Sequence, residues 1–474
     1  MPPQQTQPNT PLTIDRPMQD DVADEDTIEP GTPSARISPA ASVLPLRLRL
    51  WHRLLTPGWF RPTAAARLRG WARVITWRDA TRAERRALVV RAARLPLDSW
   101  RQARRAVAEF GAEVEAVADV TLRTQRRQLW WLAVRHGLDP ASYLDYELYR
   151  PERRRRAAAY LQEREFYRVT RWISRRAVRT DGYPVGNKLA FAAWCRTHGL
   201  AAVPTLLEYE QGLLVAANLE GDLAAALPSC DLFSKPSDGT GGHGTARWRY
   251  VGIPDGSRTW VGDDGRPRSA QELLEELAHV SQTLPPKYGV TSRRILLQPC
   301  LRNHGDLLPL TPGGLCTARV ATLRQPSGRP QVLFAAYKMP TGNSPADNFH
   351  FGGVVAPVDL ATGRLGPGIR RVGHVLVRVE RHPDTSALLA GQQLPYWEET
   401  LDLALRGLAA AYDRPSLGWD IAITDDGPIL VEGNTASNPD IAQCPAGVPL
   451  SDTPFPAAYE AYLREQLSES TSHD

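Results

Sequence analysis

The stretch Gly418-Trp-Asp-Ile-Ala-Ile-Thr-Asp-Asp-Gly-Pro-Ile-Leu-Val-Glu-Gly-Asn434 holds two runs of alternating apolar residues on either side of Asp-Asp-Gly. This pattern predicts a β-hairpin. A turn centred on Asp426 places Asp420 directly opposite Glu432, with the two side chains about 5 Å apart on one face. Asn434 lies two residues beyond Glu432 on the same side of its strand.

Two carboxylates at that separation repel each other unless a cation lies between them. Asp420, Glu432 and Asn434 offer only oxygen ligands, which suit Mg²⁺ beside a phosphate partner. The alternative is a hairpin whose acids are solvated. The apolar neighbours Ile421 and Leu430 favour the metal site, because they make a solvated strand pair less plausible.

A glycine-rich segment, Lys235-Pro-Ser-Asp-Gly-Thr-Gly-Gly-His-Gly244, lies between two short runs typical of strands. Closely spaced glycines let backbone N–H groups converge on an anion. A dinucleotide-binding loop would lead into a helix, whereas residues 246–251 predict a strand. The segment therefore indicates a flap over nucleotide phosphates, with a flexible surface loop as the alternative. The glycines are Gly239, Gly241, Gly242 and Gly244.

The basic residues are unevenly chosen. The chain has 53 arginines and only four lysines, so arginine serves wherever a generic positive charge suffices. A retained lysine indicates a place that needs a compact ammonium group, such as a phosphate site. Lys235, directly before the glycines, is such a candidate, with chance retention as the alternative.

The 474 residues correspond to about three domains' worth of chain. The formal net charge of +5 conceals a division, because residues 1–187 carry +12 and residues 188–474 carry −7. A uniform nucleic-acid-binding surface is therefore not expected, since the larger part of the chain is acidic.

Five widely spaced cysteines without a Cys-x-x-Cys pair argue against a disulfide scaffold and fit a reducing, cytoplasmic location. No stretch approaches 18 apolar residues, so we expect no transmembrane segment. The polar N-terminus lacks an apolar signal core, which argues against export.

Residue composition and the spacing of apolar residues divide the chain into four parts. Residues 1–40 are polar and rich in proline, which predicts a disordered tail. Residues 41–180 are rich in arginine, alanine, leucine and tryptophan at helical spacing and predict an α-helical region. Residues 181–465 alternate short strands with helices and predict an α+β catalytic domain. Residues 466–474 predict a second disordered tail.

Leu44–Phe60 mixes leucine, arginine and tryptophan like a helix at a membrane interface. One interpretation is that the apolar residues pack inward while the arginines are solvated. The other is peripheral contact with the inner face of the membrane. The sequence favours inward packing and leaves membrane contact open.

Two further charges lie in apolar surroundings. Arg319 is a single charge within the strand-like Thr-Ala-Arg-Val-Ala-Thr, and Lys338 ends the next strand-like run. Taken one at a time, each is typical of a satisfied core or rim residue.

Taken in order, these segments resemble the ATP-grasp superfamily, and most closely its sugar-transfer-associated branch, which is related to glutamate-ligase-like enzymes. The resemblance implies a fold in which two α+β subdomains clasp ATP. The helical, arginine-rich N-terminal region departs from it, because many members carry a small α/β domain there. The motifs are Gly186-Asn-Lys188-Leu, Ser234-Lys235-Pro with its following glycines, Ile295-Leu-Leu-Gln298-Pro, Thr317-Ala-Arg319-Val, Asp347-Asn348-Phe-His-Phe-Gly-Gly, Gly418-Trp419-Asp420-Ile and Glu432-Gly-Asn434.

The resemblance implies a role for each position on the nucleotide side. Lys188 and Lys235 would hold the α- and β-phosphates of ATP. Asp306 lies where the superfamily often has an acid that binds ribose. The loop over the triphosphate would comprise Ser237, Gly239, Gly241, Gly242 and Gly244, and the hinge beside adenine would comprise Gln298, Pro299, Cys300 and Leu301.

On the reacting side, Arg319 and Lys338 would neutralise charge on the transferred phosphoryl group. Asp420, Glu432 and Asn434 would bind one or two Mg²⁺ ions. The reaction implied is ligation of a small-molecule or glycan-linked carboxylate to an amine, or to a thiol, through an acyl phosphate in cell-surface polysaccharide or natural-product assembly. An ATP-dependent phosphotransferase and a non-catalytic nucleotide-binding adaptor are the alternatives.

Overall fold

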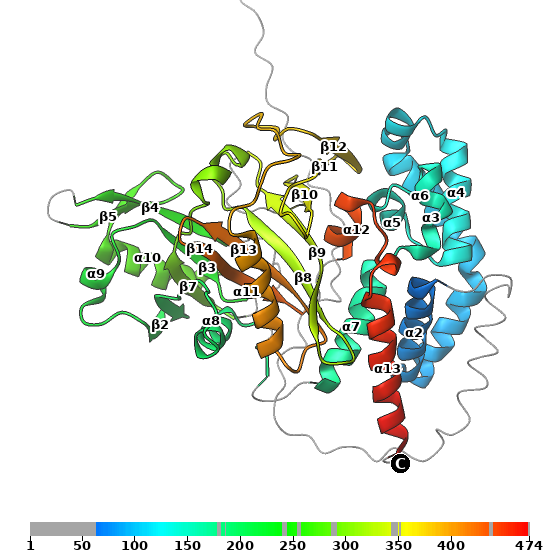
Figure 1. Cartoon of the computed structure of the whole chain (residues 1–474), viewed down its shortest axis with the longest axis horizontal. Helices are drawn as coiled ribbons and strands as arrows, with labels where there is room; N and C mark the ends of the chain where they lie inside the picture. The colour runs from blue at the N-terminus through cyan, green and yellow to red at the C-terminus, as the bar shows by residue number, and fades with distance from the viewer. Residues whose placement is uncertain are drawn as a thin grey trace, which may run out of the picture.

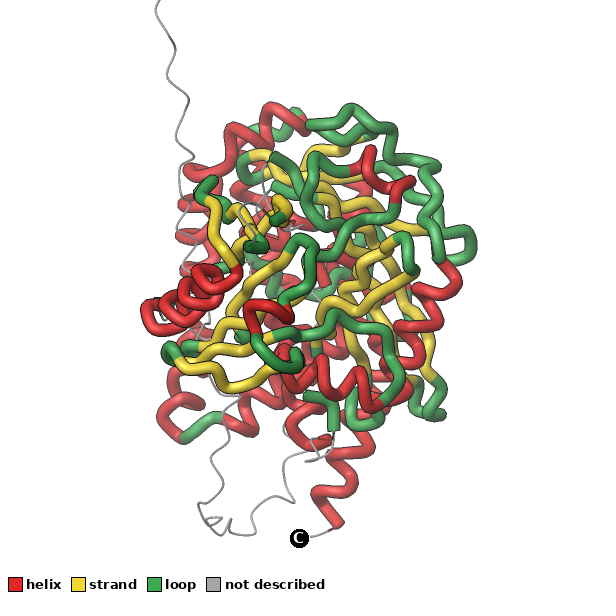
Figure 2. The backbone as a smooth tube through the Cα atoms, turned by 90° about the vertical axis from the view of Figure 1, so that its left-hand side faces the viewer, coloured by secondary structure: helices red, strands yellow, loops and turns green. Residues whose placement is uncertain are grey.

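The computed structural model describes residues 63–177, 182–184, 186–238, 244–253, 257–285, 292–342, 349, 352–435 and 439–472. This part of the chain consists of a helical N-terminal region and two antiparallel sheets of seven strands each (Figure 1). Helices flank the strands in the perpendicular view of Figure 2. The expected tail 1–40 and the segment Leu44–Phe60 lie outside the described residues.

The N-terminal region is helical, as its apolar spacing predicts. Its longest helix, α3, starts at a capping box in which Thr81 and Glu84 each satisfy the other's backbone N–H. The helix ends at Asp119, whose φ of 53° breaks the helical path. The helices are α2 (Ala64–Asp79), α3 (Arg82–Ala118), α4 (Leu122–His136), α5 (Pro140–Asp145), α6 (Pro151–Arg155) and α7 (Glu163–Ala177).

One expected helix is shorter than its sequence pattern. In the sequence, Pro151 is typical of a first-turn proline at the head of a helix over residues 152–161. Pro151 does occupy the first turn of α6, but the helix ends at Arg155 and a 3₁₀ turn, η2 (Ala157–Ala159), follows. The chain then turns inward because Tyr160 is buried and stacks on Tyr146, with ring centroids 4.8 Å apart. Burial of this ring therefore interrupts the helix that was expected to reach residue 161.

The first sheet has the order β2-β1-β7-β3-β4-β5-β6. Helix α10 (Ala270–Thr283) has the bounds that its apolar spacing predicts, and its Leu273 and Leu277 pack into one core with Trp260 of the sheet. The strands are β1 (Leu207–Glu210), β2 (Leu213–Ala217), β3 (Leu232–Pro236), β4 (Ala246–Gly252), β5 (Thr259–Val261), β6 (Pro267–Ser269) and β7 (Arg294–Pro299). The helices α8 (Lys188–Thr197) and α9 (Leu223–Ala226) accompany it.

The second sheet has the order β12-β11-β10-β9-β8-β13-β14. Helix α11 (Trp397–Ala410) covers one face, and α12 (Pro439–Ala446) packs on strands β9 to β11. The strands are β8 (Thr317–Arg324), β9 (Pro330–Met339), β10 (Val354–Val358), β11 (Gly368–Val372), β12 (Val375–Val379), β13 (Ser416–Thr424) and β14 (Gly427–Asn434), and the 3₁₀ turns are η4 (Gly305–Leu310) and η6 (Leu450–Asp452).

The β13–β14 hairpin pairs Asp420 with Glu432, which confirms the expected opposition of the two acids. Its turn, however, is centred between Asp425 and Asp426, because Thr424 pairs with Gly427. Near the turn the register is therefore offset by one residue from the expected one. A bulge beside Asp420 takes up the extra residue and restores the expected pairing.

Strand alternation decides which way Asp420 points. Its neighbours Trp419 and Ile421 belong to the core that includes Leu403 and Leu408 of α11. Because successive side chains point to opposite faces, Asp420 lies on the other face of the sheet. Ala336 and Val355 on that face join the core of the helical region, so the N-terminal helices border the face that carries the acids.

The last helix, α13, runs from Phe455 to Ser472. It therefore includes most of residues 466–474, for which the sequence predicted a disordered tail. Near its start, Phe455 and Tyr459 pack against Phe166 of α7, which anchors the helix to the N-terminal region.

Candidate functional site

Four neighbouring strands of the second sheet each contribute one charged side chain to a single row. Arg319 on β8 pairs with Asp420 on β13, and Asp420 pairs with Glu432 on β14. Lys338 on β9 pairs with Thr317, two residues from Arg319 on β8, so it lies diagonally to Arg319. The register of the sheet therefore brings together four residues that are separated by as much as 113 positions in the sequence.

Asp420 is the centre of this charged row. Arg319 holds it in a bidentate pair, with Nε 2.8 Å from Oδ1 and Nη2 2.8 Å from Oδ2. Lys338 Nζ lies 3.0 Å from Oδ1. Burial alone would raise the pKa of Asp420, but the two cations outweigh burial and lower the pKa to about 2. Asp420 is therefore ionised and fully engaged by cations.

The two other expected metal ligands follow on β14. Asn434 Nδ2 donates to Asp420 Oδ2 at 3.4 Å, which places this amide beside the carboxylate as the sequence predicts. Between Glu432 and Asn434, the carbonyl oxygen of Gly433 accepts a hydrogen bond of 2.6 Å from the Tyr183 hydroxyl. Tyr183 thus fixes the strand that carries both residues, and the sequence analysis did not identify it.

A signal for this contact was present in the sequence. Glycine inside a strand often marks a close approach of another group. A Cβ atom at Gly433 would overlap the Tyr183 hydroxyl and come within 2.8 Å of the Trp419 ring. Gly433 is therefore required by its neighbours.

Two lysines approach the row from the first sheet. Lys235 lies on β3, and Lys188 opens α8, where its Nζ donates to the carbonyl oxygen of Ser237 at 3.4 Å. Burial, together with the charge of Lys188, lowers the pKa of Lys235 to about 8, while Glu432 acts in the opposite direction. Glu432 belongs to the second sheet, so Lys235 of the first sheet and a carboxylate of the second lie within electrostatic reach of each other.

The strands around the glycine-rich segment form the expected strand–loop–strand unit, because β3 pairs with β4. At the base of the loop, the Ser237 hydroxyl lies 2.9 Å from that of Ser292, and Ser292 Oγ donates to Asp238 Oδ1 at 2.9 Å. Gly244 has a φ of +72°, a conformation that favours glycine. The other three predicted loop residues, Gly239, Gly241 and Gly242, lie outside the described residues.

The expected adenine hinge follows strand β7. Gln298 turns its side chain toward Thr205, with Nε2 3.2 Å from Oγ1, and Pro299 pairs with Leu232 of β3. The backbone N–H of Cys300 donates to the carbonyl oxygen of Asp231 at 2.9 Å. Because this N–H is already used inside the protein, a base would meet the hinge through its other backbone groups, such as those of Leu301.

Asp306 is exposed at the start of η4. Its carboxylate lies 3.8 Å from His304 Nδ1, and the preceding Gly305 N–H donates to Asp425 Oδ1 at 2.8 Å. Asp425 belongs to the closed end of the hairpin, so Asp306 is tied to the turn of the hairpin. The structure thus gives Asp306 a local partner in His304, while its neighbour Gly305 contacts the hairpin turn.

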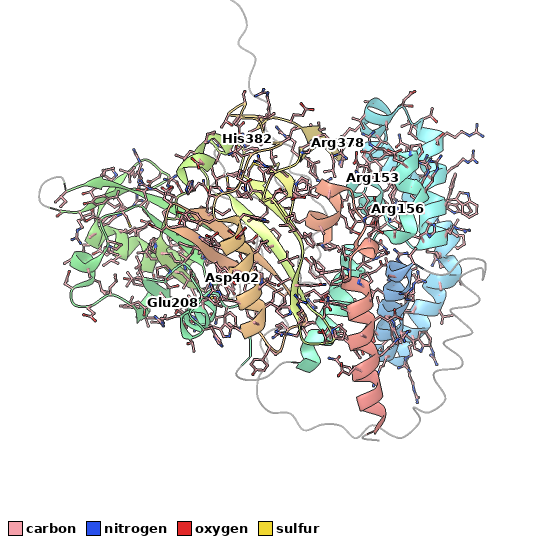
Figure 3. The ribbon with its side chains drawn as sticks, viewed as in Figure 1. Arg153, Arg156, Glu208, Arg378, His382 and Asp402 are labelled. Carbon is pink, nitrogen blue, oxygen red and sulfur yellow. The ribbon has the colours of Figure 1, made fainter. Side chains whose placement is uncertain are left out.

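The helical region reaches the row through α7. Burial raises the pKa of Tyr167 well above its ordinary value, and the nearby acids Glu163 and Asp440 raise it further, while Arg319 opposes the shift. Tyr167 therefore lies within electrostatic reach of two acids and of the arginine of the row. Farther along the same boundary, Arg153 and Arg378 approach Glu147 at 3.1 and 3.7 Å (Figure 3).

The donor set fits the groups that the sequence implies. Asp420, Glu432 and Asn434 present only oxygen acceptors, which Mg²⁺ prefers. Lys188 and Lys235 form a pair of like charges that a polyanion would stabilise. Within the described ranges, no three His, Cys, Asp or Glu side chains are close enough to hold a metal on their own.

Two antiparallel sheets, with Lys235 on one in electrostatic reach of Glu432 on the other, are the architecture of an ATP-grasp protein. Residues 167–453 match the family model described as sugar-transfer associated ATP-grasp. The chain belongs to this family. No curated protein matches the sequence.

Solved structures with similarity to this chain include three enzymes. An L-amino acid ligase from Bacillus licheniformis is 15% identical, with 58% of this chain and 47% of that chain covered and a TM-score of 0.29. A biotin carboxylase from Campylobacter jejuni is 9% identical, with 58% and 46% covered and a TM-score of 0.34. A D-alanine–D-alanine ligase from Bacillus anthracis is 14% identical, with 60% and 67% covered and a TM-score of 0.30.

The chain spans about half the length of the first two structures, at 47% and 46%. Among the described residues, none of the helices combines the length and the apolar character that crossing a bilayer requires.

Proposed function

We propose that this chain is a Mg-ATP-dependent ligase that joins a carboxylate to an amine, or to a thiol, through an acyl phosphate. The observation that carries the proposal is the row Lys338, Arg319, Asp420 and Glu432 on four neighbouring strands, faced by Lys235 of the other sheet. Membership of the ATP-grasp family supports the use of ATP.

On the nucleotide side, Lys188 and Lys235 bind the α- and β-phosphates. Their mutual repulsion in a buried site favours an anion between them, and the lowered pKa of Lys235 reflects that repulsion and burial. The loop that starts at Ser237 closes over the triphosphate, and the hinge from Gln298 to Leu301 borders the base.

On the reacting side, Asp420, Glu432 and Asn434 hold Mg²⁺. The bound ion supplies charge neutralisation between the phosphate oxygens. Arg319 and Lys338 neutralise charge on the transferred phosphoryl group. Arg319 and Lys338 both form ion pairs with Asp420. The proposal therefore requires the two cations to exchange part of that contact for phosphate oxygens.

The proposed chemistry has two steps. An oxygen of the substrate carboxylate bonds to the γ-phosphorus as the bond to ADP breaks, which gives an acyl phosphate and ADP. The amine nitrogen then bonds to the acyl carbon, and phosphate leaves with the electrons of the C–O bond while the nitrogen loses a proton. The residues of the row position the reactants and balance their charge, so no covalent enzyme intermediate is needed.

The acceptor binds, in this proposal, beside the helical region. Tyr167 of α7 lies within electrostatic reach of Arg319, Glu163 and Asp440, so the helical region borders this side of the row. The association of the family with sugar transfer supports a glycan-linked substrate. The proposal assigns the chain to polysaccharide or natural-product assembly on the cytoplasmic side.

The test is ADP release with a panel of carboxylates and amines, each supplied alone and together. Ligation requires ADP release that depends on both partners, together with a product in which an amide bond is detected by mass spectrometry. A phosphorylated acceptor formed without an amine would instead establish a phosphotransferase. Binding of Mg-ATP without turnover across the panel would indicate a nucleotide-binding adaptor.

A further inference from the structure

A patch of exposed apolar side chains lies on helices α3 and α4, outside the candidate ATP site. Pro96 lies within α3, and Trp130 Nε1 of α4 donates a hydrogen bond to the carbonyl oxygen of Pro96 at 2.9 Å. Around this point Leu97 is 51% exposed, Trp100 is 41% exposed and Trp131 is 54% exposed. Side chains of this size at such exposure indicate a surface that is covered by something other than water.

The tryptophans of the patch line an open hollow of about 340 Å³ together with Arg127. Trp130 and Trp131 meet edge to face, with ring centroids 5.4 Å apart. Two turns earlier on α3, Val90 is 55% exposed on the stripe that also carries Leu97, since seven residues make two helical turns. The apolar surface therefore extends along α3 from the hollow.

The charge around the patch is predominantly positive. Residues 82–105 of α3 contain eight arginines and two acidic residues, and α4 contains four arginines and no acidic residue. Arg123 and Arg127 are exposed and lie one turn apart on α4. A surface of this kind attracts polyanions over a distance of about a Debye length.

We propose that the α3–α4 patch, formed by Val90, Leu97, Trp100, Trp131, Arg123 and Arg127, docks the protein on an anionic lipid surface. Guanidinium groups pair with lipid phosphates, and tryptophan prefers the region between headgroups and acyl chains. A nucleic acid would use the arginines and rings but leave Val90 and Leu97 in water, so the aliphatic side chains favour a membrane.

The position of the patch suits this role. Helices α3 and α4 lie at the end of the molecule opposite β4, β5 and α9 of the first sheet (Figure 1). Docking through this end leaves β4 and β5 of the first sheet directed away from the lipid. A candidate ATP site held near the membrane in this way would reach substrates that are themselves attached to a membrane.

The experiment is sedimentation of the full chain with vesicles made of equal parts phosphatidylcholine and phosphatidylglycerol, at low and at high salt. We expect binding at low salt that weakens as salt rises, and no binding to pure phosphatidylcholine. The double variant Leu97→Glu/Trp131→Glu should lower the partition coefficient at least about tenfold, because it buries charge where apolar surface is needed. Arg123→Glu/Arg127→Glu should lower it similarly and flatten the salt dependence.

Matched controls lie at the other end of the molecule. Leu213→Glu changes a leucine that is 71% exposed on β2, and Arg266→Glu changes an exposed arginine between β5 and β6. Both should bind vesicles like the unaltered chain, and thermal melts should show that every variant is folded. Failure of the unaltered chain to sediment, equal binding by the patch variants, or binding to an oligonucleotide without vesicle binding would each overturn the proposal. Equal binding would place the contact elsewhere, with Leu44–Phe60 the next segment to test.

Discussion

Arg319 and Asp420 form a bidentate ion pair across strands β8 and β13, with both N···O distances at 2.8 Å. Lys338 adds a third contact to the same carboxylate at 3.0 Å. The proposed function assigns the two cations to the phosphoryl group and the carboxylate to the metal. In the structure the two cations and the carboxylate neutralise each other, so the ion pairs stabilise the fold, and the proposed function gives each residue a second role.

Glu432→Gln and Asp420→Asn should separate these two contributions. Both substitutions should abolish Mg-dependent ATP turnover. Asp420→Asn should also lower the free energy of unfolding by about 3 kcal/mol, because it leaves Arg319 and Lys338 buried without their anion. Glu432→Gln should lower the free energy of unfolding by less than about 1 kcal/mol.

Denaturant unfolding and ADP release measure the two effects on the same preparations. Unchanged turnover in Glu432→Gln would remove that residue from the metal site. Equal stability of the two variants would show that the ion pairs contribute little to the fold.

The pH dependence of stability should carry the signature of Asp420. Its pKa in the folded chain is about 2, below the ordinary value of 3.8. A depressed carboxylate pKa stabilises the fold above pH of about 4, and the stabilisation is lost as the pH falls toward about 2. The loss should amount to about 2 kcal/mol.

The measurement is the difference in unfolding free energy between the unaltered chain and Asp420→Asn from neutral pH down to the acid transition. The difference should shrink as the pH falls through this window. A difference that stays constant would contradict the lowered pKa of Asp420.

Lys235 should take up a proton when ATP binds near pH 9. Burial and Lys188 hold its pKa at about 8, below the ordinary 10.5. A triphosphate between the two lysines favours the charged form and raises the pKa again. Calorimetry in buffers of different ionisation enthalpy measures this uptake, and Lys235→Arg, which stays charged, is the control.

The same pKa shift predicts a change in stability with the same sign as that of Asp420, because both pKa values are lowered in the folded chain. Between pH about 8 and 10.5 the unfolded chain binds the proton of Lys235 more tightly than the folded chain. Stability conferred through this residue should therefore rise with pH across that window. Identical pH profiles for the unaltered chain and Lys235→Arg would sink this assignment.

Gly433→Ala should destabilise the hairpin by about 1–3 kcal/mol, because the added methyl group would overlap the Tyr183 hydroxyl and crowd Trp419. Turnover should fall as well, since the strand carries Glu432 and Asn434. Tyr183→Phe in the Gly433→Ala background should recover part of the lost stability by removing the overlapping oxygen. No recovery would indicate that Trp419 alone excludes the side chain.

Much of the fold could be predicted from local pattern. The residue pattern predicts a helix over 270–283 and a strand over 354–358, which are the bounds of α10 and β10, and the hairpin acids face each other as the alternation requires. The turn position could not be predicted, because a bulge beside Asp420 compensates a one-residue offset. Likewise, the helix at Pro151 ends early because Tyr160 stacks on Tyr146, the residue that follows α5. No local sequence pattern encodes this contact.

The sequence by itself determined the chemistry available to this protein. It contains the oxygen donors, the four lysines among 53 arginines, and the glycines between two strands, and these depend only on residue type and spacing. Tertiary structure decided which groups meet. Sheet register places Arg319 and Lys338 on Asp420, Tyr183 on Gly433, and Tyr167 of the helical region near Arg319. The physical reason is that ion pairs and close packing depend on distance in space, which strand pairing sets and sequence separation does not.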